Sequence, residues 1–69
     1  MIIVLTPTTH GIDAMPFNRP AEVAHINSLD HLEALLGDCL YDHQLVQLNA
    51  GFDAIADLDP DMFDLLLEN

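Results

Sequence analysis

Apolar residues recur along this chain at two spacings, and each spacing predicts a different kind of element. Residues 2–5 form an unbroken run of isoleucine, valine and leucine that is typical of a buried strand. Four leucines later repeat at helical spacing between a serine able to cap a helix and a glycine able to end one: Ser28, Leu29, Leu32, Leu35, Leu36 and Gly37. The pattern predicts a strand near 2–6 and a helix near 28–37.

The C-terminal segment carries a second helical pattern. Asp59 suits the N-cap of a helix, and Pro60 suits its first position, where a missing N–H costs nothing. A broad apolar face follows, made of Met62, Phe63, Leu65, Leu66 and Leu67. We therefore expect a helix near 60–68 that is buried against the sheet, against the first helix or against a second copy of the chain.

The segments in between are less clearly patterned. Residues 12–20 contain two prolines, which favours a loop or an irregular edge, and residues 21–26 alternate weakly, which favours a second strand. We interpret residues 43–48 as a third strand, with a helix over 39–48 as the alternative. Residues 52–58 fit a strand or a helix equally well, because periodicity does not resolve short apolar runs.

Together these elements predict one α+β domain over residues 1–69. Its elements are a small antiparallel sheet with strands near 2–6, 21–26 and 43–48, and helices near 28–37 and 60–68. A domain of this length buries only about 60% of its unfolded surface, so its core leaves a thin stability margin. Cys39 is the only cysteine, and a lone thiol predicts a reducing compartment, the cytoplasm.

Net charge narrows the class of partner. The 69 residues hold 12 Asp and Glu but one Arg and no Lys, for a net charge of −11, while 51% of them are hydrophobic. That apolar content argues against a disordered acidic tail. Nucleic-acid phosphates and anionic membranes would be repelled, and no apolar run approaches the roughly 18 residues of a membrane span. The charge therefore leaves cations and basic protein surfaces as attractive partners, and we predict a basic protein surface.

Half of the carboxylates lie in the last seventeen residues. We predict that this acidic C-terminal set binds the partner through Asp53, Asp57, Asp59, Asp61, Asp64 and Glu68. On the expected helix the last three are separated by about 4.5 and 6 Å of axial rise, comparable to the spacing of phosphates along a nucleic-acid strand. Such a row matches a groove of Lys and Arg that is built for phosphates, so the predicted partner is a nucleic-acid-binding protein.

Motifs for catalysis or metal binding are weak. A Gly-rich phosphate loop and a nucleophile elbow are both missing, so we expect a non-enzymatic protein without cofactor or metal. Acids alternate over 57–61 as at the start of an EF-hand loop, but Pro60 and Met62 replace the turn that calcium requires. Cys39 and His43 stand four residues apart, a spacing that would place two metal ligands on one side of a helix.

One short motif has a familiar form. Asn27-Ser28-Leu29-Asp30 resembles the Asp-Ser-Leu sequence of acyl carrier proteins, which are also small and acidic. The resemblance implies phosphopantetheine on Ser28. Asn27 departs from the family's aspartate, and a strand is expected upstream where that family has a long helix. The simpler role of Ser28 is to cap the helix.

In size and charge the chain is similar to small acidic phage proteins that block CRISPR effector complexes, restriction enzymes or other nucleic-acid-binding host factors. The similarity implies a DNA-mimic inhibitor, such as an anti-CRISPR protein, acting in the host-cell cytoplasm by occluding a basic site. The alternative is a homodimeric structural or protein-interaction module. Its motivation is the apolar surplus of the 60–68 helix, which would form the dimer seam.

Overall fold

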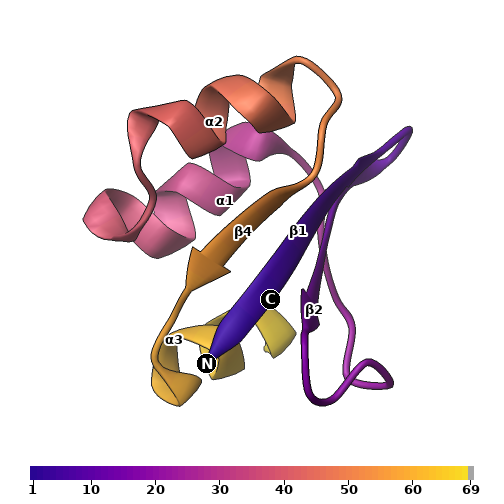
Figure 1. Ribbon diagram of the computed structural model, residues 1–69, viewed down its shortest axis with the longest axis vertical. Helices are drawn as coiled ribbons and strands as arrows, with labels where there is room; N and C mark the ends of the chain where they lie inside the picture. The colour runs from indigo at the N-terminus through magenta and orange to yellow at the C-terminus, as the bar shows by residue number, and fades with distance from the viewer. Residues whose placement is uncertain (69) are drawn as a thin grey trace.

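The computed structural model describes residues 1–68, with the side chain of residue 38 left aside. Its elements run in the order β1 (Ile2–Thr8), β2 (Gly11–Pro16), β3 (Ala24–Ile26), α1 (Leu29–Leu36), a short 3-10 turn (Gly37–Cys39), α2 (Asp42–Asn49), β4 (Ala54–Asp57) and α3 (Pro60–Leu67). Figure 1 shows the sheet on one side of the molecule, α1 and α2 together near one end and α3 near the other. The predicted α+β class is confirmed.

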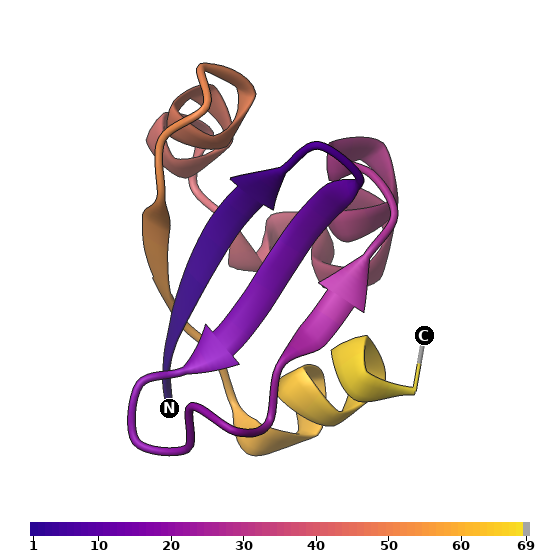
Figure 2. The same ribbon diagram turned by 90° about the vertical axis from the view of Figure 1, so that its right-hand side faces the viewer.

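The four strands form one antiparallel sheet in the order β3-β2-β1-β4, which Figure 2 shows from its open side. β1 and β2 are a hairpin in which Thr8 pairs with Gly11. β1 pairs on its other side with β4, so the N-terminal strand lies at the centre of the sheet. A long connection containing α1 and α2 separates β4 from the other strands in sequence.

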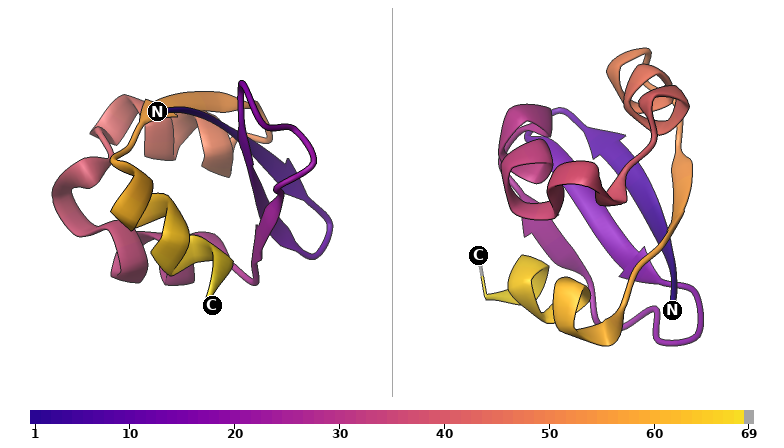
Figure 3. Two further views of the ribbon diagram at one scale, coloured as in Figure 1. Left: turned by 90° about the horizontal axis from the view of Figure 1, so that it is seen from below. Right: turned by 90° about the vertical axis from the view of Figure 1, so that its left-hand side faces the viewer.

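Alternation along each strand gives the sheet an inner and an outer face. Buried residues of neighbouring strands stand opposite one another, and these inner-face residues are Ile3, Leu5, Ile12, Ala14, Ala24, Ile26, Ala54 and Ala56. The right panel of Figure 3 shows all three helices in front of this face. Leu32, Leu36, Phe63 and Leu66 fill the space between the helices and the sheet, and each is at most 2% exposed.

The first helix forms as its leucine pattern predicts. Ser28 is extended and its hydroxyl oxygen accepts a hydrogen bond of 3.1 Å from the His31 backbone N–H. Gly37 ends the helix at a φ of 56°, in the region that favours glycine. The predicted helices 28–37 and 60–68 and the strand near 2–6 are therefore confirmed. The strand expected over 21–26 is present in its last three residues, Ala24–Ile26.

The strand predicted near 43–48 is wrong, because this segment is helix α2. The strand interpretation grouped Leu45, Val46 and Leu48, but Val46 is 68% exposed. Gln44 and Leu48 are buried instead, and their i, i+4 spacing places them on one face of a helix. The side-chain oxygen of Gln44 also accepts a 2.8 Å hydrogen bond from the Tyr41 backbone N–H, which stabilises the first turn.

Residues 12–16, expected within a loop, instead form most of β2. Pro16 is tolerated because it is the last residue of that strand, beyond the end of β3, which stops opposite Ala14. In β1, Pro7 lies beyond Leu5, the last residue that pairs with β4. Both prolines therefore lack a ladder partner on the side of their missing N–H. The open question over 52–58 is resolved as strand β4.

Candidate functional site

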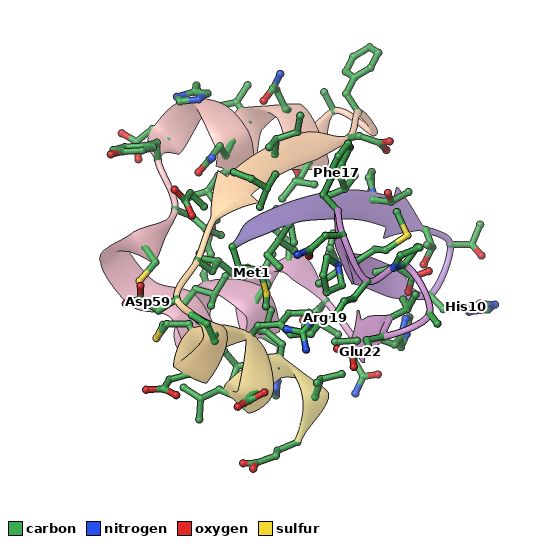
Figure 4. The ribbon with its side chains drawn as sticks, turned by 60° about the horizontal axis from the view of Figure 1, so that its bottom comes forward. Met1, His10, Phe17, Arg19, Glu22 and Asp59 are labelled. Carbon is green, nitrogen blue, oxygen red and sulfur yellow. The ribbon has the colours of Figure 1, made fainter. Side chains whose placement is uncertain are left out.

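The N-terminal ammonium and the one arginine are each engaged by a nearby carboxylate, and a histidine lies beside a third. In the loop between β2 and β3, Arg19 lies 3.3 Å from Glu22, and Figure 4 shows the two side by side. The N-terminal ammonium lies 3.1 Å from Asp57, and His25 Nδ1 lies 2.7 Å from Asp13 across the outer face of the sheet. The one arginine is therefore paired within its own loop.

Eight other described carboxylates are exposed and have no ion pair within residues 1–68: Asp30, Glu33, Asp42, Asp53, Asp59, Asp61, Asp64 and Glu68. Seven of them lie on a helix or at its end, Asp53 being the exception, and all eight face solvent. Because the chain has no lysine, its own side chains cannot balance them. The surface is strongly negative and depends on counterions or on another molecule for neutralisation.

Most of the predicted acidic C-terminal set gathers around α3. Asp59 occupies the N-cap position, as Figure 4 shows, although its side chain makes no capping hydrogen bond. Asp61, Asp64 and Glu68 follow at i, i+3 and i+4 spacing, which makes each the neighbour of the next on one side of the helix. Leu66 and Phe63 hold the opposite side against the core. The predicted row of carboxylates is therefore present and exposed.

Asp53 and Asp57 do not belong to that row of carboxylates. Asp53 precedes β4 and Asp57 ends it, so four residues of extended chain, about 13 Å, separate them. Asp57 lies near the start of α3 but is bound to the N-terminal ammonium. Asp53 lies at the opposite end of the strand, near the end of α2. The six predicted residues thus form a row of three on α3, one carboxylate at the N-cap of that helix, one paired carboxylate and one distant carboxylate.

The apolar face of α3 is mostly used inside the domain. Phe63 and Leu66 are 1% exposed and Met62 packs against the core from the side. Leu65 and Leu67 remain, at 46% and 43% exposed. The prediction of a dimer seam on this helix therefore rests on two half-exposed leucines.

Sequence reasoning missed two carboxylates that line a hollow. A groove of about 300 Å³ lies between α1 and α2, lined by Leu29, Asp30, Glu33, Leu45, Val46 and Asn49. The polar side of α1, with Asp30 and Glu33, was visible in the leucine pattern. The other wall of the groove, helix α2, was not visible, because residues 43–48 were interpreted as a strand. With α2 recognised as a helix, the i, i+3 and i, i+4 spacing of Leu45, Val46 and Asn49 would have placed them side by side.

The weaker chemical candidates do not assemble into a site. His43 stacks on Tyr41 with ring centroids 5.8 Å apart, and Cys39 lies in the separate 3-10 turn. No group of three or more His, Cys, Asp or Glu suited to a metal ion occurs among the described residues. Ser28 serves as the cap of α1 and follows a strand. None of the helices within residues 1–68 has the length and apolarity needed to cross a bilayer.

No protein-family model matches the chain, and no curated protein or solved structure shows significant similarity to it. The function is consequently inferred from the chemistry of this surface. That surface combines unbalanced carboxylates on rigid helices with one groove that is partly apolar and partly acidic.

Proposed function

We propose that this protein is a non-enzymatic binding module that occupies a basic surface on a partner protein, of the kind with which proteins bind nucleic acid. One observation carries the proposal. Eight exposed carboxylates lack a positive partner within the described residues, while the one arginine is engaged by Glu22. The same carboxylates that repel one another within the fold attract a positively charged surface strongly.

The row on α3 supports the choice of a phosphate-binding surface. Asp61, Asp64 and Glu68 are held on a helix whose other side is fixed in the core, so their spacing is preset before binding. Their axial separations of about 4.5 and 6 Å resemble those between phosphates. The proposed mechanism is steric and electrostatic occlusion, with long-range attraction raising the association rate at low salt.

The test is affinity capture followed by competition. The chain is immobilised, exposed to host lysate at 50 mM NaCl, and eluted with a salt gradient to 500 mM. We expect a retained basic protein that elutes as salt rises and that duplex DNA displaces, because DNA would compete for the same positive surface. Retention that is unchanged from 50 to 500 mM NaCl, or that DNA leaves intact, would refute the proposal.

A matched variant separates charge from shape. The triple change Asp61→Asn, Asp64→Asn and Glu68→Gln keeps the size of each side chain and removes three charges from an exposed helix side. We expect the captured partner to elute at a lower salt concentration from this variant than from the unaltered chain. The control is Leu67→Ser on the same helix, which leaves the charge alone and should elute at the original position.

A further inference from the structure

The groove between α1 and α2 combines two surfaces that are otherwise separate on this molecule. Leu29 and Leu45 pack against the core and are only partly buried, and Val46 is 68% exposed. Asp30 and Glu33 stand on the α1 side of the groove, and Asn49 stands on the α2 side. The lining therefore has an apolar part, which we call the floor (Leu29, Leu45 and Val46), and an acidic part, which we call the rim (Asp30 and Glu33). Such a lining matches a group that has an aliphatic stem and a positive head.

We propose that this groove receives an arginine or lysine side chain from the partner's surface, with its methylene stem on Leu29, Leu45 and Val46 and its cationic head beside Asp30 and Glu33. This assignment rests on the proposed function and locates its point of specific contact. The volume of about 300 Å³ lies at the lower end of the range for ligand pockets, which suits a single side chain better than a larger ligand.

Charge complementarity decides the kind of occupant. Asp30 and Glu33 are three residues apart on one helix and form no ion pair with any described group. The chain offers no lysine, and Arg19 is engaged elsewhere. A second copy of the chain would bring further negative charge to this rim. A basic side chain can pair with the carboxylates of the rim and cover the apolar side chains of the floor, whereas an apolar side chain would leave the carboxylates unpaired.

The structure contains a close internal control. α1 and α3 both have eight residues, and each carries a carboxylate in its first turn and another three residues later: Asp30 and Glu33 on α1, Asp61 and Asp64 on α3. The two pairs have the same charge and nearly the same place in their helices. They differ in the hollow, which lies beside α1. Neutralising either pair therefore removes equal charge but only one pair belongs to the groove.

The test uses n-butylguanidine as the probe, titrated into the ¹⁵N-labelled chain of 69 residues and followed by amide chemical shifts. We expect saturable shifts at millimolar probe, centred on residues 29–33 and 45–49. The double variant Asp30→Asn, Glu33→Gln should weaken this binding at least tenfold. The matched variant Asp61→Asn, Asp64→Asn should leave it within twofold, and circular dichroism confirms that both variants remain folded.

Two outcomes would overturn the inference. Equal weakening in both variants, or shifts spread over all exposed carboxylates, would mean that the probe responds to net charge alone. Equal affinity for methylguanidine would mean that the apolar floor contributes nothing. This titration and the lysate capture can fail separately. If the probe does not bind the groove but a salt-sensitive partner is captured, only this inference is refuted. If the probe binds the groove but no partner is captured, the proposed function is refuted.

Discussion

Gln44 is the polar residue on which the position of α2 depends, and replacing it gives a sharp test of the fold. Its side chain is 7% exposed and lies between the helix and the edge strand β4. The side-chain nitrogen donates a 2.6 Å hydrogen bond to the Ile55 carbonyl, and the side-chain oxygen accepts a 2.8 Å bond from the Tyr41 N–H. One amide thus caps the helix and covers the open edge of the sheet.

The change Gln44→Met keeps the length of the side chain and removes both hydrogen bonds. Each bond contributes about 0.5–1.5 kcal/mol net, and a partly buried carbonyl left unpaired adds to the loss. We expect about 2–3 kcal/mol of destabilisation. A domain of 69 residues has about 3–10 kcal/mol in total. At about 4–8 °C per kcal/mol, the melting temperature should fall by about 10–20 °C.

The measurement is urea unfolding of the unaltered protein and of Gln44→Met, combined with hydrogen exchange at the Tyr41 amide. In Gln44→Met that amide should lose its protection. In Gln44→Glu it should keep protection, because an acceptor oxygen remains, although the bond to Ile55 is lost because a carboxylate cannot donate. A loss below about 0.5 kcal/mol in Gln44→Met, with Tyr41 exchange unchanged, would refute the reasoning, since this is the size of ordinary surface substitutions.

Two further pairs of substitutions test local structure by thermal and urea unfolding. Ser28→Ala removes the cap of α1 and should cost about 1 kcal/mol, whereas Ser28→Asp restores an acceptor and should recover most of that loss; equal stability of the two would contradict the cap. Gly11→Ala should cost more than Gly37→Ala, because a Cβ on Gly11 would lie 2.0 Å from the Ile26 carbonyl oxygen while a Cβ on Gly37 meets nothing within 4 Å. Gly37→Ala should cost only the strain of its backbone, about 1–3 kcal/mol, and the reverse order would be inconsistent with the packing of β3 on the hairpin.

The helices with clear start signals in the sequence were predictable, and the sheet was predictable only in outline. α1 carries a start and a stop signal, Ser28 and Gly37, and α3 carries two start signals, Asp59 and Pro60, so local rules locate them. β2 was missed because Pro16 argues against a strand unless its place at the end of the strand is known. That place depends on where β3 stops, which is a tertiary fact. Strand order likewise depends on pairing between segments about 50 residues apart.

The segment 42–49 shows a different limit. Its helix is only weakly amphipathic by pattern, because the buried positions are Gln44 and Leu48 and the apolar Val46 faces solvent. A buried glutamine is justified only by the two hydrogen bonds that it makes to Tyr41 and Ile55. No sequence window reveals that pairing in advance. The groove and its carboxylates were lost with the same error, since one of its two walls is this helix.

Added salt should raise the stability of this protein and lower its affinity for a basic partner. The molecule measures 25 × 24 × 20 Å, and the Debye length is about 30 Å at 0.01 M salt and about 3 Å at 1 M. At low salt every carboxylate therefore repels every other across the whole domain, and at high salt that repulsion is screened to near neighbours. The free energy of unfolding should accordingly rise with NaCl concentration.

Binding to a basic partner should weaken over the same range, because the same screening removes the attraction. The two slopes are measured separately, by urea unfolding of the free chain and by affinity for the captured protein. A stability that is flat from 0.01 to 1 M NaCl would mean that the unpaired carboxylates do not strain the fold. The net negative charge would then cost the fold no stability. The large number of carboxylates would no longer be an argument that they were selected to bind a partner.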